Sequence, residues 1–418
     1  MEIYQKWIFL IVRAVIFLHY SHVYSHTVVW IRMFALKTYF PALSTRVHEQ
    51  LAYAKCSDAV KDAVVPIVTL TRYDKASTLA ETAEILIRDL AGRPAIVDFD
   101  PQPRQTTSIE EDRERRRRKA EEREEKGLPP SRERSAKELA NDKARKDQVA
   151  AFNVDLSRFT DPVHGVVRWV DMITDLPGLL PVIKPLQIED QINVILRKKV
   201  QAAIRLDPFS ENEVKACIEA GKTIRGAAEK LIIILDFKTI LGRYNDSLKT
   251  GRAVISRLTS VLDSQRNPKI VILANSFPES KTSLKNYPSI LSMEERKLHH
   301  ELSDQMPLFY GDYMSIAPRT GSSKGGQGWF PHVDLVTEDD WHIHLYESNG
   351  DQAKYIDACE DAVRGGYWRN CSDCWGKGII DHVHKNKMLE ILGKKFTVPA
   401  PWLSVRANQH LTRMALHR

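Results

Sequence analysis

The stretch Leu231–Phe237 (LIIILDF) and the later stretch Lys269–Phe277 (KIVILANSF) decide the fold. Each is a short run of mostly apolar, β-branched residues, which is typical of a strand buried on both faces of a parallel sheet. Runs of this kind recur along the chain. There are eight of them: Thr38–Leu43, Val64–Leu70, Pro94–Phe99, Leu179–Pro185, Ala202–Asp207, Leu231–Phe237, Lys269–Phe277 and Leu308–Met314.

The segments between these runs carry apolar residues at helical spacing, as Leu79, Ala83, Leu86 and Leu90 do. Eight strands that alternate with helices predict an α/β fold, the (β/α)₈ or TIM barrel. An open, doubly wound sheet shows the same alternation and remains the alternative. No G-x-G-x-x-G sequence follows the first strands, and this favours the barrel.

Composition limits the class of protein. The chain has 418 residues, of which 43% are hydrophobic and 28% charged, and this excludes a disordered, collagen-like or disulfide-knot protein. Its five cysteines are irregularly spaced, which predicts a reducing, cytoplasmic setting. The net charge of +7 is spread unevenly, because residues 364–418 hold ten basic and three acidic residues while the central body is mildly acidic.

We expect three parts along the chain. Residues 1–32 are an apolar leader or a non-native extension ahead of Met33, residues 33–318 form the barrel, and residues 319–418 form an appendage packed on it. The apolar run Trp7–Leu18 is shorter than the roughly 20 residues of a membrane span and contains Arg13. The sequence therefore does not favour a membrane protein.

A charged insertion interrupts the barrel at residues 104–148, which hold 15 basic and 12 acidic residues. Mixed charges of this kind predict a solvated helix or a disordered arm. The cluster Arg115–Lys119 could contact an anionic partner, although nearby glutamates offset most of its charge. After the eighth run we expect a β-hairpin from Phe330–Leu335 and Trp341–Glu347, then a helix at Gln352–Val363 and a basic segment.

Several short motifs, taken in order, resemble the phage beta protein family. They are Tyr39-Phe40-Pro41, Glu49-Gln50-Leu51-Ala52, Pro66–Leu70, Gly311-Asp312-Tyr313 with Pro318, Cys374-Trp375-Gly376, Trp402 and Asn408–Thr412. The resemblance covers about 33–418 and implies a barrel-like fold in a phage, prophage or anti-phage defence setting. Thr69 stands where the family's second strand is usually acidic, and the charged insertion departs from the family's pattern.

In such a barrel the functional groups gather at the carboxyl ends of the strands. Charged residues stand at that edge, and pairs two residues apart, such as Asp98 with Asp100, point to one side. The candidate catalytic residues are Asp100, Lys184, Arg205, Asp207, Asp236, Lys238 and Asp312. The aspartates would supply acid–base or divalent-metal ligands, and the cations would hold an anion. The alternative is a satisfied ion-pair network without chemistry.

A polar loop, Arg319–Gly328, follows the last predicted strand, where barrels often bind phosphate. Arg319, Ser322, Ser323 and Lys324 are the candidate phosphate-binding residues, and a flexible linker is the alternative. His332, His342 and His344 could bind zinc, but exposed strand histidines fit the pattern better. Cys371 and Cys374 form a single C-x-x-C pair, which is a weak signal for structural zinc.

The basic C-terminal segment interleaves cations with Tyr367, Trp368, Trp375 and Trp402, a pattern that can bind nucleic acid. Docking of this segment on the acidic body is the alternative. Taken together, the sequence predicts a beta-family barrel protein that acts on a phosphate-bearing or nucleic-acid substrate, with hydrolysis as one candidate reaction, and leaves open whether it is an enzyme. A non-catalytic binding or structural component of a multi-protein system, with protein partners, is the alternative function.

Overall fold

A computed structural model describes residues 39–73, 75–104, 109–125, 127, 129, 135–185, 187–262, 269–278, 289–304, 306–316, 318 and 329–417. The residues predicted as a leader, 1–32, lie outside these ranges. Across the described ranges, no helix is long and apolar enough to cross a membrane.

Eight parallel strands close into a barrel, as the sequence predicts. They are β1 (Tyr39–Ser44), β2 (Ile67–Leu70), β3 (Ala95–Phe99), β4 (Leu179–Ile183), β5 (Ala202–Leu206), β6 (Leu231–Thr239), β7 (Lys269–Asn275) and β9 (Phe309–Asp312). The ring closes where β9 pairs with β1, with Tyr310 opposite Tyr39. All eight predicted runs contain a barrel strand, so the barrel is confirmed over the open sheet.

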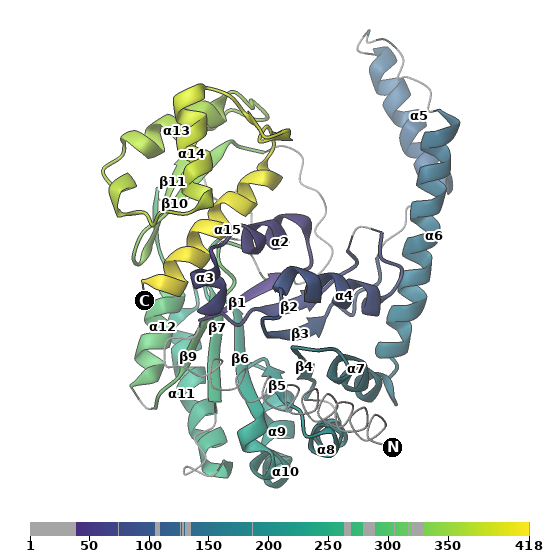
Figure 1. Ribbon diagram of the computed structural model, residues 1–418, viewed down its shortest axis with the longest axis vertical. Helices are drawn as coiled ribbons and strands as arrows, with labels where there is room; N and C mark the ends of the chain where they lie inside the picture. Colours follow the sequence, from purple (N-terminus) through teal and green to yellow (C-terminus); the bar gives the residue numbers. More distant parts are fainter. Residues whose placement is uncertain are drawn as a thin grey trace, which may run out of the picture.

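Helices surround the ring on its outer side (Figure 1). They are α2 (Val47–Ala54), α3 (Asp58–Asp62), α4 (Leu79–Leu90), α7 (Gly165–Thr174), α8 (Ile188–Lys198), α9 (Glu211–Glu219), α10 (Gly221–Gly226), α11 (Tyr244–Val261) and α12 (Glu294–Ser303). Side chains alternate along each strand, so one set fills the barrel interior and the other packs under the helices. Phe40, Ile67, Val182 and Ile234 belong to the interior set.

The charged insertion forms two long helices, α5 (Ile109–Glu125) and α6 (Ala136–Phe159), which together we call the arm. The arm projects away from the barrel (Figure 1). A capping box at Ser135 and Glu138 begins α6. Only the last part of α6 is anchored, because Phe152, Leu156 and Phe159 are its buried residues. The predicted solvated helix is therefore confirmed, as a helical pair with a packed base.

The C-terminal part builds a second layer beside the barrel. It contains β10 (His332–Val336), β11 (Asp340–Leu345), α13 (Lys354–Arg364), α14 (Trp375–Asn386), β12 (Glu390–Ile391), β13 (Lys394–Lys395) and α15 (Pro399–Leu416). The predicted hairpin is β10 with β11, which pair antiparallel. A third strand, β8 (Ile290–Ser292), comes from between β7 and β9 and pairs with β11. Sequence patterns do not reveal β8, because it is only three residues long and mostly exposed.

Helix α15 joins the two layers. Its first half contributes Trp402 and Val405 to the core of the appendage. Its second half contributes Ala407, Leu411 and Met414 to the core around the barrel. In Figure 1, α15 runs from the appendage down to α2 and α3 at the barrel. One continuous helix therefore belongs to both cores.

Candidate strand-end site

A cavity of about 820 Å³ opens at the carboxyl ends of the barrel strands. We call it the strand-end cavity. Its size suits a small molecule, because ligand pockets typically span about 300–1,000 Å³. Its lining is strongly charged and nearly balanced, with five cations and six carboxylates: Arg46, Arg104, Lys184, Arg205 and Lys238, and Glu49, Asp98, Asp100, Asp207, Glu213 and Asp236.

The alternation of each strand explains why these groups meet. Ile96, Val182 and Ile234 point into the apolar interior. Asp98, Lys184 and Asp236 follow them two residues later, on the same side of their strands and at the open end of the ring. The charged residues thus form a layer directly above the apolar filling of the barrel.

Arg205 is the centre of this layer. Its Nε and Nη2 atoms donate to Asp236 Oδ2 at 3.0 and 2.8 Å. Its Nη1 atom donates to Asp98 Oδ2 at 3.4 Å, and Nη2 also donates to the Tyr313 hydroxyl at 2.6 Å. Burial alone would lower the pKa of Arg205, but Tyr313 and the two aspartates raise it, so the guanidinium stays charged.

Lys184 completes the layer from β4. Its Nζ atom donates to Asp98 Oδ1, so Asp98 is held between two cations. Burial acts to raise the pKa of Asp98, but the charges of Lys184 and Arg205 outweigh it and lower the pKa. Asp236 accepts hydrogen bonds from Tyr313 Oη at 2.7 and 2.8 Å. At the base of the cavity, then, the carboxylates are already engaged.

A second ion pair lies nearer the rim. Lys238 Nζ lies 2.8 Å from Asp207 Oδ2, and its side chain is 45% exposed, compared with 29% for Lys184 and 16% for Arg205. A register shift between Asp236 and Lys238, with Lys238 at φ 55°, re-aims the end of β6. Burial acts to lower the pKa of Lys238, but its hydrogen bond with Asp207 raises it. Lys238 is therefore held in its charged form, as an anion-binding role requires.

Asp312 does not reach the cavity, which corrects the expectation that it joins the other aspartates. It lies under α15, where it accepts from Tyr39 Oη at 2.5 Å and from Tyr310 Oη at 2.6 Å. His410 Nε2 on α15 lies 2.8 Å from its Oδ2 atom. Its neighbour Tyr313 points inward instead, and the sequence analysis missed it. Strand β9 pairs with β1, where Phe40 opposes Gly311 and points into the barrel. Alternation from Gly311 places Tyr313 on the same inner side and Asp312 on the outer side.

The remaining sequence candidates are placed as follows. The four phosphate-loop residues, Arg319, Ser322, Ser323 and Lys324, lie outside the described residues. His342 contacts Thr337 and stacks on Tyr367, whereas His332 contacts Arg406, so the three histidines do not gather in one site. His332 and His342 are buried, so the expectation of exposed strand histidines is wrong for these two. Throughout the described part of the chain, no group of three His, Cys, Asp or Glu side chains is arranged to hold a metal ion.

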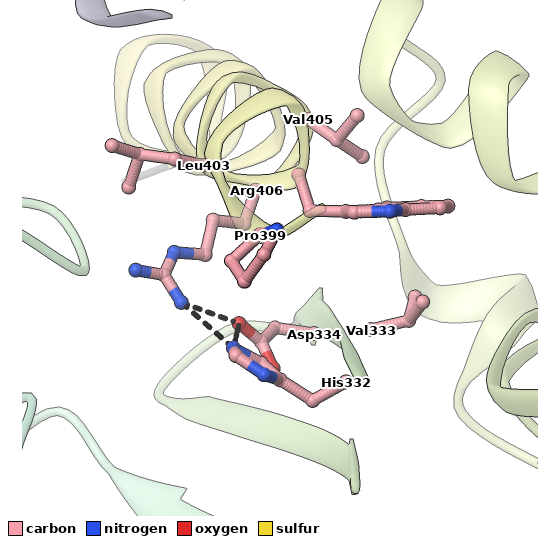
Figure 2. Close-up of a pocket in the computed structure, with 8 residues that line it drawn as sticks. His332, Val333, Asp334, Pro399, Leu403, Val405 and Arg406 are labelled. Carbon is pink, nitrogen blue, oxygen red and sulfur yellow. Dashed lines mark hydrogen bonds and ion pairs between the residues drawn. The ribbon is translucent and has the colours of Figure 1, made fainter. Parts of the chain in front are cut away.

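The C-terminal cations are mostly engaged within the appendage. Arg406 Nη1 lies 3.1 Å from both His332 Nε2 and Asp334 Oδ2, as Figure 2 shows. The cavity beside them is only about 10 Å³, room for little more than one water molecule. Five other cations of this segment pair with carboxylates: Arg364, Lys377, Lys385, Lys387 and Arg413. Six of the ten basic residues of this segment therefore have a carboxylate partner.

Comparison with known proteins identifies the family of this chain. A family model described as "Beta protein" matches residues 39–416. The chain belongs to the Beta protein family. A similar curated protein is "Protein beta" of Enterobacteria phage P4, which is 24% identical over 262 residues, or 60% of this chain and 70% of the phage protein. No solved structure gives a significant match. The resemblance read from the motifs is therefore confirmed.

The residues that carried the Beta-protein resemblance gather mainly at the junction of the two layers. Asn408 donates to the Ala52 carbonyl at 3.0 Å, and its Oδ1 atom accepts from Gly376 N–H at 2.9 Å. Asp312 and His410 form a second tie between β9 and α15. These motif residues therefore hold the appendage on the barrel, whereas the strand-end cavity is lined mainly by residues outside the motifs.

Proposed function

We propose that the chain binds a phosphate-bearing small molecule of nucleotide size in the strand-end cavity. The observation that carries this proposal is the convergence of Lys184, Arg205 and Lys238 above the apolar barrel interior. Each cation comes from a different strand and is fixed by a carboxylate. A site whose polar groups are already held in place loses little entropy when it binds a ligand.

The balance of charge narrows the ligand class. Five cations set against six carboxylates do not attract a bare polyanion strongly. A nucleotide offers phosphate oxygens to the cations, while its ribose hydroxyls and base amino groups can donate to carboxylates such as Asp207 and Asp100. The relative in phage P4 supports placing this function in a phage or prophage setting.

A binding role fits the base of the cavity better than hydrolysis. Asp98 and Asp236 are already engaged with Arg205, and Asp98 also with Lys184, so neither is a free general base. The alternative from the sequence, a non-catalytic component of a multi-protein system, therefore remains compatible with the same cavity. Hydrolysis of nucleic acid would have to use the less buried Asp100 or Asp207.

The test is equilibrium binding by the purified full chain. The probes are inorganic pyrophosphate and the four ribonucleoside 5′-monophosphates, and calorimetry measures the affinity of each. Lys184→Gln and Lys238→Gln remove one cation each and should weaken binding about tenfold or more, because a hydrogen bond to a charged group is worth about 1.5–3 kcal/mol. Lys215→Gln, on exposed α9, is the matched control and should bind as the wild type does.

If none of these probes binds, or if both cavity variants bind like the wild type, the proposal is wrong. A parallel gel with end-labelled DNA and RNA, with Mg²⁺ or Mn²⁺ at two salt concentrations, separates binding from cleavage. Shortened products that Asp207→Asn abolishes would establish a nuclease. A salt-sensitive shift without shortening would indicate nucleic-acid binding.

A further inference from the structure

One wall of the strand-end cavity comes from the chain that leads into the arm. Residues 100–104 (DPQPR) follow β3 and line the cavity before the insertion begins. Asp100 N–H donates to the Leu70 carbonyl at 3.0 Å, which continues the strand pairing beyond β3. The charged insertion is thus connected directly to the candidate site.

This wall is held rigidly. Pro101 and Pro103 fix two of its backbone φ angles. Asp100 Oδ1 accepts from Gln102 N–H at 3.1 Å, the bond of an Asx turn. At its end, the Asn153 amide of α6 accepts from Arg104 N–H and donates to the Arg104 carbonyl, both at 2.9 Å. One side chain therefore satisfies both backbone groups of Arg104.

Helix α6 is well placed to act as this clamp. Phe152 and Leu156, which flank Asn153, are buried against the barrel. Asp155 Oδ2 accepts from Leu79 N–H at 2.9 Å, and Arg72 Nη2 donates to Gln148 Oε1 at 3.2 Å. Two polar contacts and an apolar base therefore fix the position of Asn153 relative to the ring of strands.

Arg104 differs from the cations at the base of the cavity. Lys184, Arg205 and Lys238 each have a carboxylate partner. No ion pair or side-chain hydrogen bond joins the Arg104 guanidinium to any residue in the described ranges, and the side chain is half-exposed at the cavity. No carboxylate of the described residues is paired with it, and it offers five donors in a planar fork that matches a phosphate group.

We propose that Arg104 binds the phosphate group of the ligand and that Asn153 positions it. This inference rests on the proposed function and identifies the residue that selects for phosphate. It also gives the inserted arm a role, because its base completes the site that the barrel strands begin. Asn153 acts through Arg104 and does not itself touch the ligand.

The experiment compares a nucleoside monophosphate with the nucleoside that lacks the phosphate, using the full-length chain and calorimetry. Arg104→Gln should weaken binding of the monophosphate about tenfold and leave the nucleoside within twofold of the wild type. Asn153→Ala should weaken the monophosphate several-fold. The double variant should bind no more weakly than Arg104→Gln alone, since a positioning residue has no effect once its target is gone.

Asn141→Ala is the matched control, because Asn141 is an exposed asparagine on the same helix. Asn153→Asp keeps the acceptor for Arg104 N–H and should retain part of the affinity, which guards against an alanine variant that fails to fold.

If Arg104→Gln binds the monophosphate normally while Lys184→Gln does not, Arg104 is not the phosphate ligand but the proposed function stands. If Asn153→Ala has no effect, or if the double variant is additively weaker, the positioning role is overturned. If no probe binds the wild type, both proposals fail.

Discussion

Among single residues, the buried side chains of Arg205 and Glu295 differ in the charge state that their surroundings favour. In the strand-end cavity, Arg205 is surrounded by Asp98, Asp236 and Tyr313, so its positive charge is matched by partners. Near the junction, Glu295 on α12 is fully buried, and no cation among the described residues forms an ion pair with it. Its Oε2 atom accepts from Ser276 N–H at 3.1 Å, and the nearby charge is that of Asp312. The first group favours its charged form and the second its neutral form.

Glu295 predicts a pH dependence of stability. Burial first, and then the charge of Asp312, raises the pKa of Glu295 to about 8, above its ordinary value of 4.5. Between these values the folded chain holds a proton that the unfolded chain releases, so the free energy of unfolding falls as pH rises from about 5 to 8. Glu295→Gln removes this dependence. We expect the variant to gain about 3 kcal/mol relative to the wild type on going from pH 5 to pH 8.

Urea unfolding at the two pH values measures this gain. Glu84→Gln, at an exposed position on α4, is the control and should not change with pH relative to the wild type. A gain that is the same at both pH values would show that Glu295 is already ionised in the folded state over this range, and would contradict the prediction.

At the scale of elements, the contact between α14 and α15 depends on a missing side chain. A Cβ atom at Gly376 would lie 2.3 Å from the Val405 carbonyl oxygen and 3.0 Å from Gln409 Cγ. Gly376 also donates its N–H to Asn408. Two helices can approach this closely only where one of them carries glycine. This gives a physical reason for glycine in the Cys374-Trp375-Gly376 motif.

Two alanine substitutions on α14 test this contact. Gly376→Ala must push α15 away, and we expect a loss of about 2 kcal/mol or more in the free energy of unfolding, with breakage of the Asn408 bond. Gly378→Ala, one half-turn away, meets nothing within 4 Å and should stabilise the helix by about 0.5–1 kcal/mol. Thermal or urea unfolding compares them, and equal effects of the two substitutions would show that α14 and α15 do not pack this closely.

At the scale of the whole molecule, the barrel, the appendage and the arm depend on one another to different degrees. The appendage shares α15 with the barrel core, so it is built into the same folding unit. The arm packs on the barrel only through the base of α6, and residues 136–141 of that helix are exposed on all sides. A segment that buries no apolar surface contributes little to the stability of the remainder.

Two deletions should therefore behave differently. Replacing residues 109–146 by a flexible Gly/Ser linker should leave the melting temperature within a few degrees of the wild type, and ligand binding unchanged. Arg104 and Asn153, which stand on the two sides of the deleted segment, are in contact, so a linker can bridge the deletion. Extending the deletion to residue 156 removes Phe152, Asn153 and Leu156 and should lower the melting temperature by about 5 °C or more. A large loss in the shorter deletion would contradict this division of the arm.

The number, order and type of the barrel strands can be predicted from local sequence patterns alone. Runs such as Leu231–Phe237 are apolar on both faces, and only a sheet covered on both sides buries them fully. The same patterns also place Lys184, Arg205 and Asp236 at one edge, because residues that end parallel strands share an edge. These inferences need only local patterns and the rule that a closed barrel has one functional face.

Which of these residues come into contact depends on the packing of segments that are distant in the sequence. Asp312 and Tyr313 are adjacent in sequence, yet strand alternation sends the aspartate under α15 and the tyrosine into the cavity. His410 and Asn153, far from the strands in sequence, are brought to Asp312 and Arg104 by helices that pack on the ring. Contacts between distant segments depend on how helices pack in three dimensions, and no periodicity along the chain records that packing.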